Sequence, residues 1–344
     1  MELKNKYVIG NLTMWYEVEM FSEYIDSCIQ MLEGIENPKN VTFHFCISTD
    51  QTLEESEPEY YGTGDDEILF VDHLYDRISN EINRLKEFHP NIIIEESSNH
   101  YPKFYNIAAY RRNLNHNWCE QVDFVLWGET DSMWPKQTLE IIEAITAQEH
   151  YPKFVLNFAG RKNWDKTWDI ITHPLFQNEQ FQDNDDWTLN NNASEKSYMT
   201  LERMNEINNI SFEEIELQIF DQPKADGSCL VISSDLIKSG VNIPHALIHC
   251  GEDESFLRMA KLVMGDDFVQ YHIHNILRVH NRRHPRKRSY IKGENNPRGF
   301  CDERKGDWWK LLENNSKKNL DNLRNQVKFV KTKDVIDQIQ KLNK

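Results

Sequence analysis

The hydrophobic positions in the first fifty residues fall into two short runs separated by an amphipathic stretch. Residues 7–12 and 41–47 are mostly apolar, whereas residues 16–32 place their apolar side chains three or four positions apart. Short apolar runs predict buried strands, and a spacing of three to four predicts a helix. A strand, a helix and a second strand in this order are typical of the start of a parallel sheet.

The same alternation returns along most of the remaining chain. Apolar runs predict strands over 91–95, 122–127, 154–158, 229–233 and 268–274. Apolar residues at helical spacing predict helices over about 73–88, 103–119, 135–148 and 252–264. The final segment, about 316–343, also has helical spacing and is expected to pack back onto the body. The pattern therefore predicts an α/β fold with helices flanking a mostly parallel sheet.

Two stretches interrupt this alternation. Residues 50–67 contain eight acids, no base, one proline and two glycines, which is typical of a solvated excursion. Residues from about 161 to 222 lose the regular pattern and include stretches rich in Asn and Asp. We expect both stretches to be insertions.

The charge of the chain limits its partners. Among 344 residues, 39 are Lys or Arg and 56 are Asp or Glu, which gives a net charge of −17. Such an acidic protein is not expected to coat nucleic acid with its whole surface. Seven of the basic residues, however, lie within 278–292, where no acid occurs. This segment is either a solvated basic loop or a local site for phosphates or another anionic partner.

The cysteines, the first residues and the apolar runs indicate in which cellular compartment the protein is expected. The six cysteines are widely spaced and form no Cys-x-x-Cys pair, so neither a zinc knuckle nor a redox motif is indicated. The first residues lack the apolar stretch and cleavage site of a signal peptide. No apolar run approaches the roughly 20 residues needed to span a bilayer. We therefore expect a cytoplasmic protein without a transmembrane segment.

Two carboxylates, Glu129 and Asp131, follow the predicted strand 122–127 with one residue between them. In open α/β sheets, ligands bind at the carboxyl ends of the strands. Carboxylate oxygens are the ligands that Mg²⁺ and Mn²⁺ prefer, often together with phosphates of a bound molecule. Glu129 and Asp131 therefore either hold such an ion or belong to an ordinary turn that caps the next helix.

This acidic segment resembles the metal-binding Asp-x-Asp turn of nucleotide-sugar-dependent glycosyltransferases of the GT-A fold, especially the family 2-like enzymes. The pair Arg112-Asn113 precedes Glu129 at a distance closely similar to that of an Arg-Asn pair in that family. The run Gly251-Glu252-Asp253-Glu254 matches the family's acceptor-side signature of a glycine, two acids and a helix. The resemblance covers roughly residues 6–280. One departure is that Glu129 stands where the family has an aspartate.

The resemblance implies a GT-A, Rossmann-like domain over residues 1–280, with a mixed, mostly parallel sheet. Residues 281–344 would then form a basic loop and a C-terminal helical extension. It also implies a metal-dependent transferase that moves a sugar from a nucleotide-sugar donor to an acceptor hydroxyl, with inversion. A UDP- or GDP-sugar is the leading candidate donor. Candidate acceptors are a glycan or another hydroxyl-bearing molecule, including modified nucleic acid.

Several residues match positions that bind the donor in this family. By resemblance they are Asn11, Thr13, Asp50, Arg112, Asn113, Glu129, Arg278 and Arg282. Asp50 would accept hydrogen bonds from the base or the ribose, unless it simply begins the acidic stretch. Arg112 would face the donor diphosphate, unless it is an ordinary surface arginine of the helix.

For catalysis, the resemblance points to Asp253 as the general base. An inverting transferase needs a carboxylate that takes the proton from the acceptor hydroxyl as the hydroxyl attacks the anomeric carbon. Glu252 or Glu254 could serve in this role instead. The alternative is that these acids only complement the dipole of the helix that they begin.

The resemblance also implies that a histidine completes the metal site of Asp131 and Glu129. Many GT-A enzymes carry it after the last core strand, and both His274 and His280 occupy suitable positions. Lone histidines are otherwise more often structural or surface residues. The metal would be Mn²⁺ or Mg²⁺.

Two other functions compete with glycosyl transfer. A sugar-phosphate nucleotidyltransferase shares the α/β architecture, but it would show a Gly-rich, Arg-containing loop directly after the first strand, which residues 10–14 lack. A non-catalytic nucleotide- or glycan-binding protein of the same fold could keep the acids without the chemistry.

Overall fold

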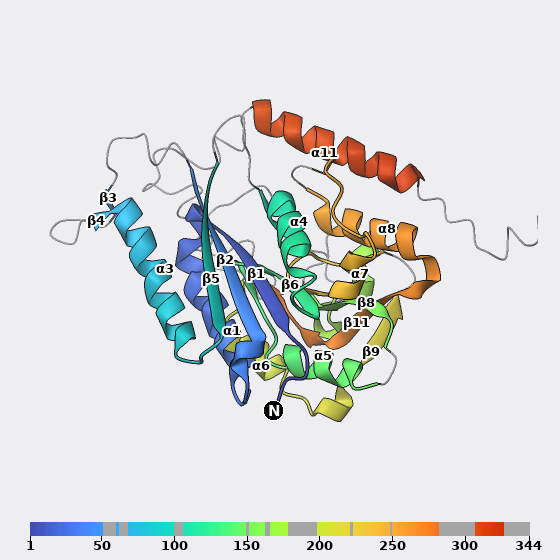
Figure 1. Ribbon diagram of the computed structural model, residues 1–344, viewed down its shortest axis with the longest axis horizontal. Helices are drawn as coiled ribbons and strands as arrows, with labels where there is room; N and C mark the ends of the chain where they lie inside the picture. The colour runs from blue at the N-terminus through green and yellow to red at the C-terminus, as the bar shows by residue number, and fades with distance from the viewer. Residues whose placement is uncertain are drawn as a thin grey trace, which may run out of the picture.

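One eight-stranded β-sheet forms the centre of the molecule (Figure 1). The structure is a computed structural model of the 344-residue chain. It describes residues 1–50, 60–61, 68–99, 106–148, 151–161, 166–177, 198–220, 223–247, 250–281 and 307–326.

The strands of the central sheet run in two opposite directions. They are β1 (Tyr7–Met14), β2 (Val41–Asp50), β5 (Asn91–Asn99), β6 (Phe124–Glu129), β8 (Lys153–Ala159), β9 (Leu217–Phe220), β10 (Leu230–Ser233) and β11 (Phe268–Leu277). Their order is β5-β2-β1-β6-β10-β8-β11-β9. Neighbours pair in parallel except where β10 or β9 takes part, because these two strands run opposite to the rest. The sheet is therefore mixed and mostly parallel, as the sequence predicted.

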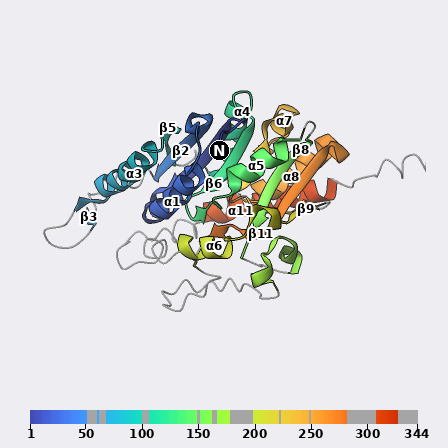
Figure 2. The same cartoon turned by 90° about the horizontal axis from the view of Figure 1, so that it is seen from below.

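Helices cover both faces of the sheet (Figures 1 and 2). One core cluster holds apolar residues of α1 (Phe21–Leu32), α3 (Phe70–Lys86) and α5 (Thr138–Thr146). The other holds residues of α4 (Ile107–Trp118), α7 (Ser234–Lys238), α8 (Glu252–Met264) and α11 (Asp307–Gln326). The fold is an α/β sandwich of three layers.

The alternation of side chains along a strand explains how one sheet supports two cores. In β1, Tyr7 and Ile9 belong to the first cluster, whereas Val8 and Leu12 belong to the second. Successive side chains of a strand point to opposite faces, so a strand buried on both faces is apolar throughout. This is why the predicted strands were continuous apolar runs.

Short elements complete the described chain. The remaining strands and α-helix are β3 (Tyr60–Tyr61), β4 (Ile68–Leu69), β7 (Ser132–Met133), β12 (Val279–His280) and α6 (Leu201–Ile207). The 3₁₀ helices are η1 (Trp15–Met20), η2 (Pro38–Asn40), η4 (Lys166–Ile171), η5 (Pro174–Phe176), η6 (Phe212–Glu214) and η7 (Gly265–Asp267). The strand β7 pairs antiparallel with β12, which joins two segments far apart in the sequence.

Most predicted elements are confirmed, and a few differ. The helix predicted over 16–32 begins as η1 and becomes α-helical only at Phe21. The last helix begins earlier than predicted, at Asp307, and is described as far as Gln326. The irregular stretch 161–222 contains α6 and the edge strand β9, which the pattern did not predict. The division at residue 280 and the two insertions stay predictions, and much of 50–67 lies outside the described residues.

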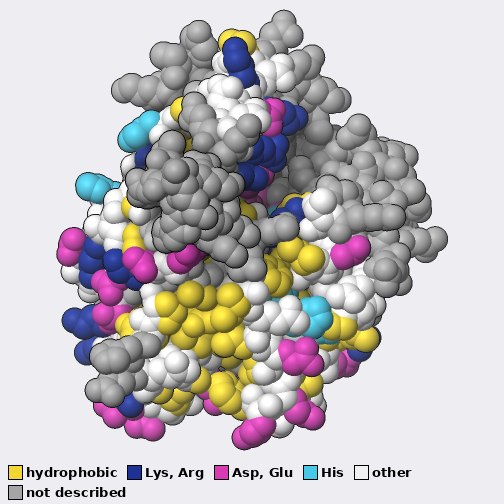
Figure 3. Space-filling view, turned by 90° about the vertical axis from the view of Figure 1, so that its right-hand side faces the viewer, with side chains coloured by type: hydrophobic (Ala, Val, Ile, Leu, Met, Phe, Trp, Pro, Cys, Tyr) yellow, Lys and Arg dark blue, Asp and Glu magenta, His cyan; other side chains and the backbone are white. Residues whose placement is uncertain are grey.

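The edge strand β9 borders an apolar surface. Leu217 and Ile219 of this strand are exposed. Figure 3 shows hydrophobic side chains gathered on the face toward which β9 lies in Figure 1.

Within the described residues, no helix combines the length and the apolar character that crossing a membrane requires.

Candidate active site

The candidate site lies at the carboxyl ends of β1 and β6. These strands are neighbours, and Leu12 pairs with Glu129 in their parallel register. The chain continues from β1 to β2 on one side, while β6 lies on the other side of β1. At such a point the chain connections leave neighbouring strands in opposite directions. Ligands of open α/β sheets bind outside the carboxyl ends of the strands at these points. The fold therefore places the acidic segment 129–131 where a ligand is expected.

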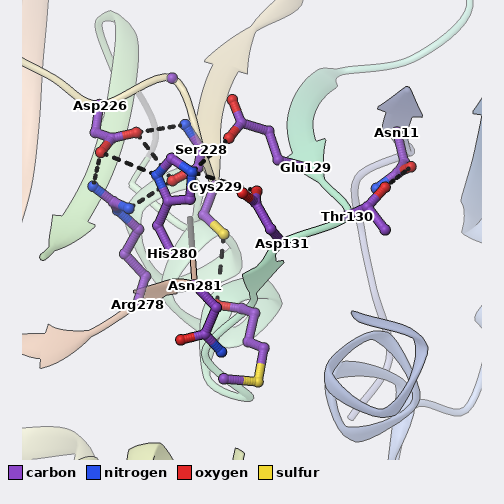
Figure 4. A network of polar contacts seen from close by, with 12 residues as sticks. Asn11, Glu129, Thr130, Asp131, Asp226, Ser228, Cys229, Arg278, His280 and Asn281 are labelled. Atoms are coloured by element: carbon purple, nitrogen blue, oxygen red, sulfur yellow. Dashed lines mark hydrogen bonds and ion pairs between the residues drawn. The ribbon is translucent and has the colours of Figure 1, made fainter. Parts of the chain in front are cut away.

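A small buried cluster of polar side chains links the ends of β1 and β6. The Thr13 hydroxyl donates to Asn11 Oδ1 at 2.6 Å, and Thr130 Oγ1 lies 3.1 Å from the same oxygen. All three side chains are buried. Among the described residues, Asn11 Nδ2 has no hydrogen-bond partner. The structure thus brings the predicted Asn11 and Thr13 beside the acidic segment. Figure 4 shows Asn11 next to Thr130. Asp50 ends β2, and its side chain lies outside what the structure describes.

Glu129, Asp131 and His280 form a group able to hold a metal ion. One ligand atom of each lies within 4.8 Å of the others. His280 Nε2 is 3.2 Å from Glu129 Oε2 and 3.3 Å from Asp131 Oδ1. Two carboxylate oxygens and one imidazole nitrogen are a donor set that fits Mn²⁺ or Mg²⁺.

The pairing of β7 with β12 explains why His280 reaches these acids. His280 lies opposite Ser132, one residue after Asp131, and the Asn281 backbone N–H donates to the Asp131 carbonyl. His274 is not part of this group. It lies on β11 beside β9, where its backbone N–H donates to Glu216 and its ring faces His272. Of the two predicted histidines, the structure brings only His280 to the acids.

Arg111 connects the two acidic motifs. It is fully buried, and its guanidinium donates to Glu129 Oε1 at 2.6 Å and to Glu252 Oε1 at 2.6 Å. A third hydrogen bond reaches the Gly227 carbonyl at 2.8 Å, and the guanidinium carbon lies 4.9 Å from the centre of the Trp127 ring. A planar guanidinium can make all these contacts at once, which an ammonium cannot.

The sequence pointed to Arg112 for this region, but the structure brings its neighbour Arg111 to the acids. Arg112 donates to the carbonyls of Ile243, Pro244 and Leu247, so it holds the loop before α8 instead of facing the acids. Asn113 lies on the exposed side of α4. Neighbouring residues of an α-helix point about 100° apart, because a turn takes 3.6 residues. A shift of one position along α4 therefore separates the site from the surface.

Glu252 and Asp253 begin α8 beside Arg111. Asp253 Oδ2 accepts the Gly227 backbone N–H at 3.0 Å, and its other oxygen accepts the N–H of Glu254. Burial, together with the nearby charges of Glu252 and Asp226, raises the pKa of Asp253 to about 8. Burial also raises the pKa of Glu252, although Arg111 opposes this.

Glu254 binds two arginines. Its carboxylate accepts a hydrogen bond from Nε of Arg258 at 2.7 Å, and two more from Nε and Nη2 of Arg324, a residue of α11. Although burial opposes it, these hydrogen bonds hold the pKa of Glu254 below its usual range. Leu320 of α11 packs against Gly251, the residue before α8. The helix α11 thus contacts the turn that carries Asp253.

The turn 226–229 before β10 supplies an acid that the sequence reasoning missed. Asp226 pairs with Arg278 at 2.7 Å and lies 3.6 Å from His280 Nδ1. Burial opposes its ionisation, but Arg278 and His280 hold the pKa of Asp226 well below its usual range. Cys229 has a φ of 57°, a rare conformation for a residue with a side chain. No spacing pattern marks Asp226, and its position just before a buried strand is the one signal that could have drawn attention to it.

The two predicted arginines of the basic segment have different outcomes. Arg278 is buried and bound to Asp226 and Ser228, so the structure places it at the site. Arg282 and the rest of the basic run lie outside the described residues.

The acids of the site outnumber its arginines. The carboxyl groups belong to Glu129, Asp131, Asp226, Glu252 and Asp253, and the guanidinium groups to Arg111 and Arg278. The raised pKa values of Glu252 and Asp253 reflect this crowding as well as burial. A divalent cation beside Glu129 and Asp131 would offset the excess of negative charge.

Comparisons with known proteins leave the family open. No family model and no curated protein matches the chain. Among solved structures, S. aureus TarS 1-349 is 16% identical over 78% of this chain and 60% of that chain, with a TM-score of 0.38. The same protein in complex with UDP-GlcNAc is 15% identical over 78% of this chain and 58% of that chain, with a TM-score of 0.36. A structure described as a mycobacterial protein is 12% identical over 80% of this chain and 67% of that chain, with a TM-score of 0.39.

These values are too low to assign a family or an activity. The chain also spans only about 60% of the length of TarS 1-349 and 36% of a longer TarS structure.

Proposed function

We propose that this protein is a metal-dependent glycosyltransferase of the GT-A type, which moves a sugar from a nucleotide-sugar donor to an acceptor hydroxyl. The observation that carries the proposal is the meeting of two acidic motifs, which lie more than a hundred residues apart in the sequence. Arg111 binds Glu129 of one motif and Glu252 of the other at 2.6 Å each. Arg111 therefore links an acid of the candidate metal site to the start of the helix that carries the candidate base.

Glu129, Asp131 and His280 are the residues that would hold Mn²⁺ or Mg²⁺. When bound, the ion would supply positive charge to the departing diphosphate of the donor. Of the two histidine candidates, His274 and His280, the proposal keeps only His280. Glu129 also binds Arg111, which fixes the orientation of its carboxylate.

Asp253 is the proposed general base. Its pKa of about 8 lies close to neutral pH, the range in which a carboxylate accepts a proton most effectively during catalysis. The Gly227 N–H holds its Oδ2, which fixes the direction from which an acceptor hydroxyl can be deprotonated. A base on the acceptor side that deprotonates the attacking hydroxyl is the arrangement for inversion at the anomeric carbon.

The end of β1 is proposed to take the nucleotide. Asn11 and Thr13 lie there beside Thr130, and Asn11 Nδ2 offers a donor group that no described residue uses. The donor is proposed to be a UDP- or GDP-sugar. Candidate acceptors are a glycan or another molecule with a free hydroxyl, including modified nucleic acid.

A thermal-shift panel tests the proposal without knowledge of the acceptor. UDP-, GDP-, CMP- and dTDP-sugars are added to the full chain with and without Mn²⁺. At least one nucleotide sugar should raise the melting temperature in the presence of the metal, since a ligand that binds only the folded state stabilises it. The Asp131→Asn variant should lose this metal-dependent shift. If no nucleotide stabilises the wild-type protein with Mn²⁺, the proposal is wrong.

A further inference from the structure

We propose that Asp226 is a positioning residue for the metal site, where it holds the imidazole of His280 with Nε2 turned toward Glu129 and Asp131. This inference rests on the proposed function, because it assumes that these residues bind a metal ion. It concerns a residue outside the three-residue group, on a different segment of the chain.

The imidazole of His280 lies between acids on both sides (Figure 4). Nε2 is 3.2 Å from Glu129 and 3.3 Å from Asp131. On the opposite side of the ring, Nδ1 is 3.6 Å from Asp226 Oδ2. At this distance the contact with Asp226 is electrostatic, and it needs only a small approach to become a hydrogen bond.

Asp226 is itself held firmly. Its Oδ1 accepts the backbone N–H and the hydroxyl of Ser228 at 3.0 Å each. Its Oδ2 pairs with Arg278 at 2.7 Å, and Arg278 also donates to the Ser228 hydroxyl. Both oxygens are thus fixed, and Oδ2 is the one that faces His280. Because Arg278 precedes His280 by two residues, the same segment holds the acid and presents the histidine.

The chemistry of histidine explains what this arrangement would do. A neutral imidazole carries one N–H, and the other nitrogen is the one that binds a metal. A carboxylate facing Nδ1 favours the form with the proton on Nδ1, which leaves the Nε2 lone pair for the ion. Such outer partners fix the ring and raise its basicity. Asp226 would therefore increase metal affinity without touching the ion.

The competing explanation is that Asp226 only neutralises the buried Arg278. The two explanations differ in their dependence on His280. If Asp226 acts through the imidazole, its removal matters only while the imidazole is present. If it serves Arg278 alone, its removal has the same effect with or without His280.

A double-mutant cycle on Mn²⁺ affinity separates these explanations. Mn²⁺ is titrated by calorimetry into wild-type protein, Asp226→Asn, His280→Ala and the double variant, with no nucleotide present. Asparagine keeps the size of the side chain but removes the negative charge that faces Nδ1 of His280. We expect Asp226→Asn to weaken Mn²⁺ binding by about 10- to 100-fold, as for other outer partners of metal-binding histidines. In the His280→Ala background, the same substitution should leave the affinity unchanged.

The outcomes distinguish this inference from the proposed function. If the wild-type protein binds no Mn²⁺ without nucleotide, this inference is overturned, whereas the proposed function is judged by the thermal-shift panel with nucleotide and Mn²⁺. If the wild-type protein binds Mn²⁺ and Asp226→Asn binds it equally well, only the role of Asp226 is overturned. An equal loss in both backgrounds also overturns it, because the effect would not pass through His280. If Asp226→Asn does not fold, the variant Asp226→Asn with Arg278→Gln removes both charges of the buried pair and allows the same comparison.

Discussion

Arg111 donates a 2.6 Å hydrogen bond to Glu129, which is 18 residues further along the chain. The same guanidinium reaches Glu252 on α8. One buried cation therefore compensates two acids from separate motifs, and it ties the proposed metal site to the start of α8.

Removal of Arg111 should be far more harmful than removal of its neighbour. Arg111→Met leaves Glu129 and Glu252 without their cation, and loss of one partner of a buried ion pair costs about 3–5 kcal/mol. We expect the free energy of unfolding to fall by this order and sugar transfer to be lost. Chemical denaturation measures the first effect. Arg112→Met is the matched control, because it removes only hydrogen bonds to the carbonyls of a loop. Equal losses in the two variants would contradict the assigned role of Arg111.

Glu252 should control the pH at which the base works. Burial raises the pKa of Asp253, and the charge of Glu252 raises it further, to about 8. The substitution Glu252→Gln removes that charge, so the pKa of Asp253 should fall. The acidic limb of the kcat/KM profile should therefore move to lower pH in this variant. An unchanged limb would show that a group other than Asp253 is the base.

The raised pKa of Asp253 should also appear in the stability of the protein. Its pKa is about 8 in the folded state and near 4 in an unfolded chain, so the folded state binds more protons between these values. The contribution of Asp253 to stability therefore falls as the pH rises from about 4 to about 8. Asp253→Asn lacks this dependence. We expect the variant to gain stability relative to the wild type as denaturation is measured from pH 5 to pH 9, while it loses transfer. A constant difference across this range would contradict the raised pKa.

A side chain at Gly251 should cost more stability than the left-handed backbone conformation alone. Its φ is 76°, and an added Cβ would lie 2.6 Å from Leu320 of α11. A residue with a side chain pays about 1–2 kcal/mol for the left-handed conformation alone. Gly34 has a φ of 75° with open space around it, so Gly34→Ala measures the backbone cost by itself. We expect Gly251→Ala to lose more stability than Gly34→Ala in thermal or chemical unfolding. Equal losses of stability in the two variants would mean that Leu320 of α11 does not hinder a side chain at Gly251.

The order of the longer strands and helices could be predicted from the sequence because they form periodic segments of the core, whereas α6 and β9 lie in a stretch without a regular pattern. The helix over 252–264 has the bounds that its amphipathic pattern predicted. The strands β7 and β12 could not be predicted, since two residues carry no periodicity. Their pairing decides that His280 and not His274 approaches the acids.

The sequence pointed to most of the acids in the candidate site, but not to Asp226 or to the buried Arg111. Glu129, Asp131 and Asp253 follow from motifs that sit at the ends of regular elements. The choice between Arg111 and Arg112 depends on how α4 is rotated against the sheet, which spacing along the chain does not fix. Asp226 lies in a turn without a regular pattern, so only the folded chain places it near His280.

The most direct test of the account is an anomalous difference map from crystals of the full chain grown with Mn²⁺ and the nucleotide that the thermal-shift panel selects. The account predicts one strong manganese peak between Glu129, Asp131 and His280, with the diphosphate of the nucleotide beside it. A bound nucleotide with no manganese at these three residues, or manganese bound elsewhere, would contradict it.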